Sequence, residues 1–324
     1  MNSNRYAKSF VFVFLIILAI AVARWILLVN VQYSYMDGEF PYWMQQKDYV
    51  HTKNDKSEVL FMGDSRMKAG IIPERICDNA YNLAVGGGVA IEAYYSLLDY
   101  LKYHPKPKIV VMGFAAFHYQ DHGEFETRNL YFHYLSSKNQ LAAQFVLYKL
   151  GQVDFQGLKS KIIDTLKYNL LFPQKYSAAC IKSKFKREKN NRTMFQKNAD
   201  AKGHMYFGLK ERDDNLNPET KRKKFYVNAR ENYYLHKIID LCQKNEIPLF
   251  IEQLPMNTPS WNKINENGFY ADYRAYMESV MKETGVPVEL EIPCYDVECF
   301  GDSSHMNSRG AEKFSSEIKG KYQL

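Results

Sequence analysis

The sequence predicts a mixed α/β fold built on a parallel sheet, preceded by a membrane helix and interrupted by a helical insertion. Three observations lead to this prediction. Short apolar runs alternate with stretches that carry apolar residues at helical spacing, which is typical of a parallel sheet. The N-terminus carries one long apolar stretch. Between residues 120 and 222 the alternation stops, and the chain becomes polar, basic and helical in propensity.

These patterns divide the 324 residues into four expected parts. Residues 1–30 are expected to form a membrane anchor and 31–57 a stalk. Residues 58–119 and 224–324 are expected to fold together as one domain, and 120–223 to form a basic, helical insertion or cap. Strands are expected at 59–62, 81–85, 108–113, 247–251 and 286–292, and helices at 89–103, 224–245, 268–284 and 308–321.

Residues 9–29 are long and apolar enough to cross the hydrocarbon core of a bilayer as a helix. Arg24 interrupts the run near its far end, where its side chain can reach the interface beside Trp25. Arg5 and Lys8 precede the run and acidic residues follow it. The positive-inside rule therefore predicts a single-pass plasma-membrane protein with a cytoplasmic N-terminus and an exported remainder.

Two alternatives exist for this apolar segment. A cleavable signal peptide is one, because residues 21–23 resemble a cleavage site. The apolar residues 25–29 that follow argue instead for an uncleaved anchor. A buried core helix is the other, although no amphipathic pattern supports it.

The net charge is +7, and the excess is concentrated between residues 175 and 197, where Glu188 is the single acidic residue. Such a run favours an anionic surface, such as lipid headgroups or a polyphosphate polymer. A solvated loop is the alternative. No nucleic-acid-binding motif accompanies the run, so no nucleic-acid partner is predicted.

Aromatic residues make up 15% of the chain, which fits either ordinary packing or a sugar-binding groove. The five cysteines show no CxxC pattern and no His/Cys ligand spacing, so neither a structural zinc nor another metal or cofactor is predicted. Cys294 and Cys299 are close in sequence and could pair outside the cytoplasm, or could be two ordinary buried thiols.

Ser65 is the candidate nucleophile. It follows the first expected strand, and sites in open parallel sheets lie at the carboxyl ends of strands. The tripeptide Gly-Asp-Ser also occurs at residues 301–303, but only the copy at 63–65 follows a strongly apolar strand. A serine hydroxyl needs a base to take its proton, so a second element must supply one.

Asp302 and His305 are the candidate partners of this serine. They lie three residues apart just before the last expected helix, a spacing at which the two side chains can meet on a turn. The carboxylate would hold the imidazole tautomer, and Nε2 of His305 would then face Ser65. The alternative is a helix N-cap followed by a surface histidine.

An acyl-transfer site also needs donors for the oxyanion. Gly86 and Gly87 end the second expected strand, where their amides can approach a substrate closely, and the amide of Ser65 is a further donor. The alternative is that the glycines only make a turn.

Taken together, these motifs resemble the SGNH (GDSL-like) hydrolase superfamily over residues 58–118 and 224–321, about half of the chain. The resemblance implies a flavodoxin-like three-layer α/β/α fold, with Ser65, Asp302 and His305 as the catalytic residues and Gly86 or Gly87 in the glycine block. One block departs from the family: the third usually reads Gly-x-Asn-Asp, whereas this chain has no asparagine between Gly113 and His118.

The membrane anchor, the Gly-Asp-Ser-Arg sequence and the Asp-x-x-His-Met-Asn sequence look like anchored SGNH-like proteins that modify cell-surface polymers, such as D-alanyl-lipoteichoic acid transfer and alginate O-acetylation proteins. The resemblance implies a polysaccharide or teichoic-type polymer as substrate and a membrane-bound O-acyltransferase as partner. His118 could replace the missing oxyanion donor, or could be structural. Arg66 could steer an anionic substrate, or could pair with Asp64.

The sequence therefore predicts an extracytoplasmic esterase or O-acyltransferase that works through an acyl-enzyme. The alternative from a different class is a catalytically inactive, membrane-anchored scaffold or polymer-binding protein with the same fold. A phosphoesterase or sulfatase is less favoured, because no metal-binding cluster is evident.

Overall fold

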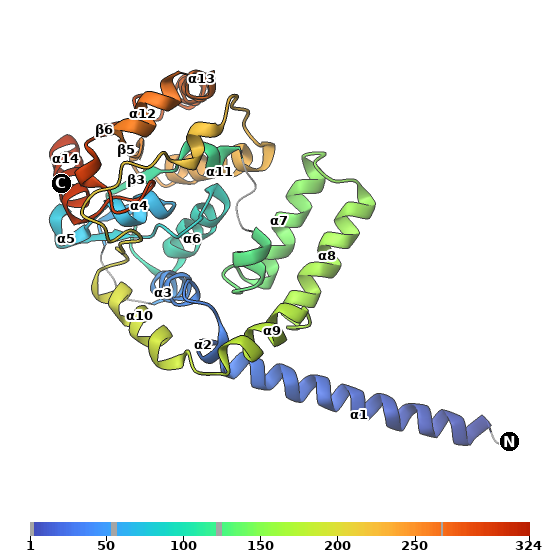
Figure 1. Cartoon of the computed structure of the whole chain (residues 1–324). Coiled ribbons are helices and arrows are strands. Elements are labelled where there is room, and N and C mark those ends of the chain that lie inside the picture. Colours follow the sequence, from blue (N-terminus) through green and yellow to red (C-terminus); the bar gives the residue numbers. More distant parts are fainter. Residues whose placement is uncertain (1–2, 53–56, 121–124, 267) are drawn as a thin grey trace.

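The structure, a computed structural model, describes residues 3–52, 57–120, 125–266 and 268–324. Within these residues the α/β class is confirmed, because a parallel sheet of four strands lies at the centre with helices packed around it (Figure 1). The strand order is β2-β1-β3-β4. The strands are β1 (Val59–Gly63), β2 (Ala80–Asn82), β3 (Ile109–Gly113) and β4 (Leu249–Ile251). A two-stranded parallel sheet is formed by β5 (Met256–Asn257) and β6 (Cys294–Tyr295).

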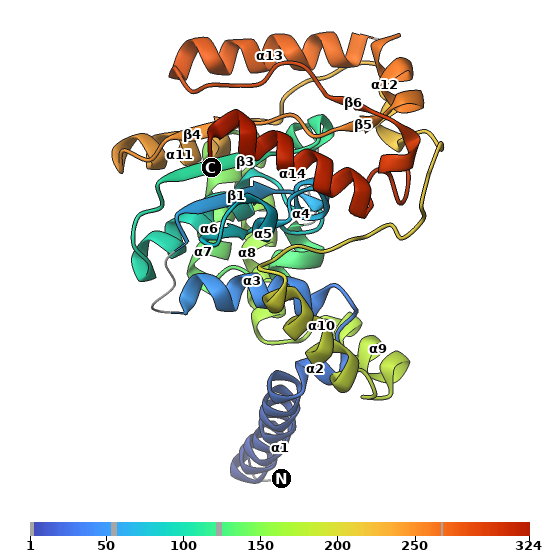
Figure 2. The same ribbon diagram turned by 90° about the vertical axis from the view of Figure 1, so that its left-hand side faces the viewer.

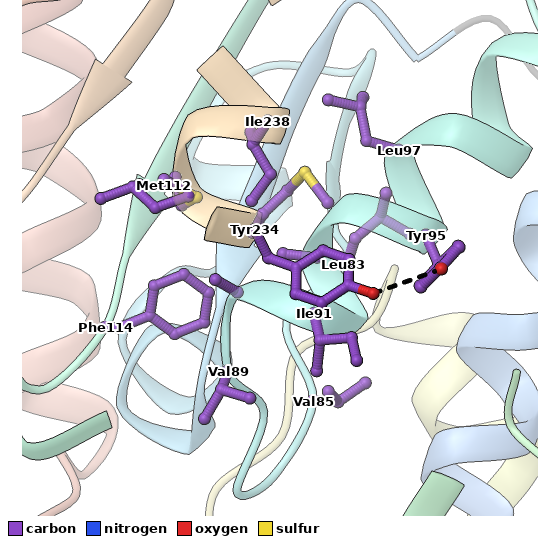
Figure 3. Close-up of a cluster of buried hydrophobic side chains, with 14 of the residues drawn as sticks. Leu83, Val85, Val89, Ile91, Tyr95, Leu97, Met112, Phe114, Tyr234 and Ile238 are labelled. Atoms are coloured by element: carbon purple, nitrogen blue, oxygen red, sulfur yellow. Dashed lines mark hydrogen bonds between the residues drawn. The ribbon is translucent and has the colours of Figure 1, made fainter. Parts of the chain in front are cut away.

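Helices cover both faces of the central sheet, which explains why its longer strands are continuous apolar runs. Leu60 and Met62 of β1 share one hydrophobic cluster with α6 (Ala90–Tyr103) and α11 (Ala229–Lys244). Figure 3 shows this cluster, in which the hydroxyl groups of Tyr95 and Tyr234 lie 3.4 Å apart. The alternate residues of β1 belong to a second cluster, which includes α5 (Pro73–Ile76) and α14 (Ser308–Tyr322). The finer flavodoxin-like three-layer arrangement stays a prediction.

The N-terminal helix α1 (Ser3–Asn30) projects away from the rest of the protein (Figure 1). Most of its apolar side chains between Tyr6 and Asn30 are exposed, for example Phe10 at 74%. The stretch from Tyr6 to Asn30 is long and apolar enough to cross a membrane, as the sequence predicts.

Residues 31–52 fold against the main body and do not form the expected stalk. They contain α2 (Gln32–Tyr35) and α3 (Phe40–His51), and α3 packs against α6 and the insertion. Trp43 of α3 is 1% exposed. Residues 53–56 of the expected stalk lie outside the described residues.

The insertion is largely helical, as expected, although residues 121–124 lie outside the described part. It contains η2 (Phe125–Leu130), α7 (Ser137–Lys149), α8 (Phe155–Asn169), α9 (Gln174–Ser183), α10 (Glu188–Asp200) and η3 (Pro218–Lys221). The short helix η1 (Ala116–Tyr119) precedes it in the loop after β3. After α10 the chain becomes mostly extended and runs past the start of α14 (Figure 2). This return segment, residues 201–228, brings the insertion back to the sheet.

The remaining elements are α4 (Ser65–Gly70), α12 (Thr258–Asn265), α13 (Gly268–Thr284) and η4 (Val297–Cys299). The expected strand at 286–292 is wrong. Only Val288 bridges to Ile251 there, and the nearby strand β6 begins at Cys294. Pro287 and Pro293 lack the N–H groups that a regular ladder would use, which explains the interrupted pairing.

Candidate active site

Ser65 and His305 meet where β1 ends. Ser65 is the first residue of α4, and its Oγ lies 2.8 Å from Nε2 of His305, although the two residues are 240 positions apart. The other ring nitrogen, Nδ1, lies 2.9 Å from Oδ2 of Asp302. A carboxylate can only accept this hydrogen bond, so Nδ1 carries the proton and Nε2 is left to accept from the serine hydroxyl.

Local backbone contacts explain how Asp302 and His305 reach this geometry. Oδ1 of Asp302 accepts from the backbone N–H groups of Ser304 and His305, each at 2.8 Å, which folds the loop around the carboxylate. The N–H of Gly301 donates to the carbonyl of His305 at 2.9 Å and closes the loop. The spacing of three residues therefore places both functional groups on one rigid turn.

The surroundings of Asp302 favour its charged form. Burial opposes ionisation, but the hydrogen bond from His305 and its electrostatic interaction, together with the two backbone N–H groups, outweigh it and lower the pKa of Asp302 below its usual value. The side chains of His305 and Asp302 are 18% and 38% exposed, and Ser65 is half-buried. The three groups are therefore accessible from outside the protein.

Asp64 has a structural position next to Ser65. It caps α4, because its Oδ1 accepts from the N–H of Arg66 at 2.8 Å. Its Oδ2 accepts from the N–H of Ala115 at 2.8 Å and lies 3.4 Å from Nε2 of His118. Asp64 is fully buried and His118 is 8% exposed, so both side chains join α4 to the loop after β3.

Arg66 forms its ion pair with Glu219 rather than with Asp64. Its Nη2 lies 2.7 Å from Oε2 of Glu219, and the two side chains are 5% and 0% exposed. Oε1 of Glu219 also accepts from the N–H of Phe117 at 3.2 Å. Glu219 belongs to the return segment, so its contacts join the insertion to α4 and to the loop after β3.

The turn at Gly86 and Gly87, called the glycine turn, lies close to the end of β1 and to Phe207. The N–H of Val85 donates to the carbonyl of Gly63 at 3.1 Å, which ties the turn to the end of β1. Gly87 has a φ of 69°, a conformation that glycine adopts without strain, and Gly86 and Gly87 are both half-buried. A Cβ atom at Gly86 would lie 3.5 Å from the ring of Phe207, which itself packs on His305.

The return segment supplies residues that sequence reasoning missed. Phe207 contacts His305, and Nδ2 of Asn217 donates to Oγ of Ser304 at 3.2 Å. Gly208 packs directly on Gly301, where a Cβ at Gly208 would lie 2.3 Å from the carbonyl carbon of Gly301. None of these residues forms a motif. Asn217 directly precedes Pro218, a pair that signals a turn but not a contact with the site.

A surface cavity borders the same loop. Its lining includes Gly208, Lys210, Arg212 and Arg309 beside the start of α14, together with Glu298. Gly208 joins the cavity to Gly301, the neighbour of Asp302. The cavity is therefore next to the candidate site and carries both basic and acidic groups.

All five cysteines are free thiols, so Cys294 and Cys299 are not joined in this structure. Cys294 is exposed, whereas Cys299 is buried in η4. Among the described residues, no group of three or more His, Cys, Asp or Glu side chains is placed to hold a metal ion.

Comparison with known proteins adds one match. A model of an uncharacterised family matches residues 181–322, which is less than half of the chain. The matched part contains Asp302, His305 and the return segment, and it does not contain Ser65. No curated protein matches the chain.

Proposed function

We propose that the protein is a membrane-anchored, extracytoplasmic serine enzyme of the SGNH type that acts on ester bonds of a cell-surface glycan or teichoic-type polymer. The observation that carries this proposal is the continuous hydrogen-bonded chain from Ser65 through His305 to Asp302. Nucleophile, base and orienting carboxylate within hydrogen-bond distance are the arrangement that serine acyl transfer requires. The proposal includes the three-layer fold that the resemblance implies.

In the proposed reaction, Oγ of Ser65 bonds to the acyl carbon while its proton passes to Nε2 of His305. The charged imidazole is stabilised by Asp302 and then gives that proton to the leaving oxygen as the ester bond breaks. The acyl group is now on Ser65. A second hydroxyl, from water or from the polymer, loses its proton to Nε2 as its oxygen bonds to the acyl carbon. The bond from that carbon to Oγ of Ser65 then breaks, and Nε2 returns the proton to Oγ, which restores the serine.

The amides of Ser65 and of Gly86 or Gly87 are the proposed donors to the oxyanion. The loop after β3 is a poorer source, because the N–H groups of Ala115 and Phe117 already donate to Asp64 and Glu219. His118 is directed toward Asp64 in the same region. The glycine turn therefore takes the larger share of oxyanion binding in this proposal.

The compartment and the substrate class complete the proposal. The apolar helix α1 would hold the folded part at the outer face of the membrane. A polymer anchored in the same envelope would then be within reach, and a membrane-bound O-acyltransferase is the proposed source of acyl groups. Basic residues near the site, such as Lys210 and Arg309, suit an anionic polymer.

Hydrolysis of p-nitrophenyl acetate by the full-length protein in detergent, with and without a glycan acceptor, tests this proposal. We expect Ser65→Ala to abolish turnover. The matched control is Ser303→Ala, because Ser303 belongs to the second Gly-Asp-Ser tripeptide, beside Asp302, and should leave turnover nearly unchanged. Acceptor-dependent loss of free acetate would assign transfer rather than hydrolysis. Equal rates of hydrolysis for Ser65→Ala and the unaltered protein would refute the proposal that Ser65 is the nucleophile of an enzyme.

The non-enzymatic scaffold is the second candidate, and the absence of an asparagine between Gly113 and His118 favours it. It predicts a different cellular result. Cells that carry Ser65→Ala in place of the unaltered protein would keep normal acylation of their surface polymers, whereas cells that lack the protein would not.

A further inference from the structure

Exposed apolar side chains gather in one part of the insertion. Outside α1, nine of the thirteen large apolar side chains that are exposed among the described residues lie between Phe145 and Phe185. They include Ile181, which is 77% exposed, and Phe155 at 65%. Such a concentration on a folded protein marks an interaction surface.

On α8 these side chains form a single stripe. At about 100° of rotation per residue, Phe155, Ile163, Leu166 and Leu170 fall within an arc of about 80°. Leu158 and Thr165 are on another side of the helix and are buried, and α8 packs against α7. The exposed stripe is therefore a helix face that no described part of the protein covers.

This surface is continuous with the end of α1. The guanidinium group of Arg24 donates to the carbonyl of Leu171 and lies 3.4 Å from Oγ of Ser177. Nε1 of Trp25 donates to the carbonyl of Asn169 at 3.4 Å. Figure 1 shows α8 and α9 on the side of the body from which α1 extends.

These contacts fix the depth of the surface. Arginine and tryptophan at the end of an apolar helix lie where the hydrocarbon core meets the headgroups. The turn between α8 and α9 is bonded to both residues, so it lies at that same depth. Leu170 and Phe172 flank the bonded carbonyl of Leu171 and are 51% and 52% exposed.

The charges beside the surface match an anionic lipid layer. Lys182, Lys184 and Lys186 are exposed and alternate with the apolar surface of Ile181 and Phe185. Apolar side chains next to lysines are typical of segments that lie in the membrane interface. Each lysine near an anionic leaflet adds an electrostatic attraction to it.

We propose that the exposed face of α8 and α9 rests in the headgroup layer of the bilayer that α1 crosses. The occupant is a lipid surface with anionic headgroups, and the inference rests on the membrane anchoring in the proposed function. Two separate attachments would prevent the folded part from turning freely about α1. The enzyme would therefore present its site to the membrane-bound polymer in one orientation.

Fluorescence quenching in proteoliposomes tests this surface. The full-length protein carries Ser in place of Cys77 and Cys294, the two cysteines that are not buried. Single labels with an environment-sensitive dye are placed by Phe172→Cys and Ile181→Cys. The control is Leu209→Cys, since Leu209 is 87% exposed on the return segment. Vesicles contain phosphatidylcholine and phosphatidylglycerol with brominated acyl chains as quenchers.

We expect the labels at 172 and 181 to be quenched at least twofold more than the label at 209, and more strongly with phosphatidylglycerol present than without it. Equal quenching at all three positions would overturn the inference. A fourth label, Ile17→Cys in α1, separates the two hypotheses. Loss of quenching at 17 contradicts the anchor itself, whereas quenching at 17 without quenching at 172 and 181 contradicts only the second contact.

Discussion

Phe207 packs against the imidazole of His305, with ring centroids 4.8 Å apart and an angle of 32° between the planes. The same phenyl ring lies beside Gly86 of the glycine turn. One side chain from the insertion therefore contacts both the proposed base and the proposed oxyanion-binding turn. The insertion contributes to the site directly and is more than a lid above it.

We expect Phe207→Ala to lower kcat about tenfold, which corresponds to about 1.4 kcal/mol, with little change in KM. The imidazole would lose the surface that limits its rotation, while the ester-binding groups stay in place. Steady-state kinetics with p-nitrophenyl acetate measures this split. Leu209→Ala, two residues away and exposed, is the control. A change confined to KM would show that Phe207 binds substrate and does not position His305.

Asp302→Asn should lower kcat by a factor on the order of 10³–10⁴, because an amide would hold the wrong imidazole tautomer. The fold should survive, since the amide oxygen can still accept from the N–H groups of Ser304 and His305. The rate of covalent labelling of Ser65 by a fluorophosphonate should fall in parallel, and mass spectrometry of the labelled peptide measures it. Unchanged labelling would remove Asp302 from the proposed relay.

Glu219→Gln should destabilise the protein by about 3 kcal/mol, because it leaves the guanidinium of Arg66 buried without a counter-charge. Thermal unfolding of the full-length protein in detergent measures the loss. The double variant Arg66→Met/Glu219→Leu should be more stable than the single one. Glu312→Gln is the matched control, since the Arg75–Glu312 pair is exposed and should contribute almost nothing. Similar losses for both single variants would contradict a special role for the buried pair.

Lys68 should make the stability depend on pH. Its ammonium is fully buried against the carbonyl groups of Ala84 and Gly203, and burial lowers the pKa of Lys68 to about 7. Between this value and the ordinary 10.5, the unfolded chain holds a proton that the folded chain lacks. The free energy of unfolding therefore rises with pH in this window, by up to about 1.4 kcal/mol per unit, and the gain is lost as pH falls toward 7.

Lys68→Met should flatten this dependence. Denaturant titrations of the full-length protein at about pH 7.5 and pH 9.5 give the slope, which should fall by about one proton in the variant. Lys102→Met is the control, because Lys102 is exposed on α6 and pairs with Asp99 three residues away. An identical slope in Lys68→Met and the unaltered protein would place the titrating group elsewhere.

The sequence could predict that Ser65, Asp302 and His305 come together, because each one is tied to a local pattern. Ser65 follows an apolar strand whose carboxyl end had to face the crevice. Asp302 and His305 share one turn, so their spacing already determines most of their geometry. The contact between Ser65 and the turn that carries His305 joins segments far apart in the sequence. This contact required the first strand to lie inside the sheet, as it does.

The supporting residues could not be predicted in the same way. Phe207 contacts His305 in the loop before α14, and Glu219 pairs with Arg66 of α4. More than 90 residues of chain separate each pair, and no periodicity or motif marks such contacts. The segment 31–57 was misjudged for a related reason. Its polar and aromatic composition suits a solvated spacer, yet Tyr49 stacks on Tyr81 with ring centroids 3.4 Å apart.

Glu219 contacts both Arg66 and the N–H of Phe117, so the insertion cannot be removed without loss to the rest of the fold. A shortened chain that joined residue 119 directly to 224 would keep the serine, the aspartate and the histidine. In that chain the guanidinium group of Arg66 would be buried without a counter-charge, and the N–H of Phe117 would have lost its acceptor. Scaffold and insertion must therefore be inherited, transplanted or redesigned as one piece.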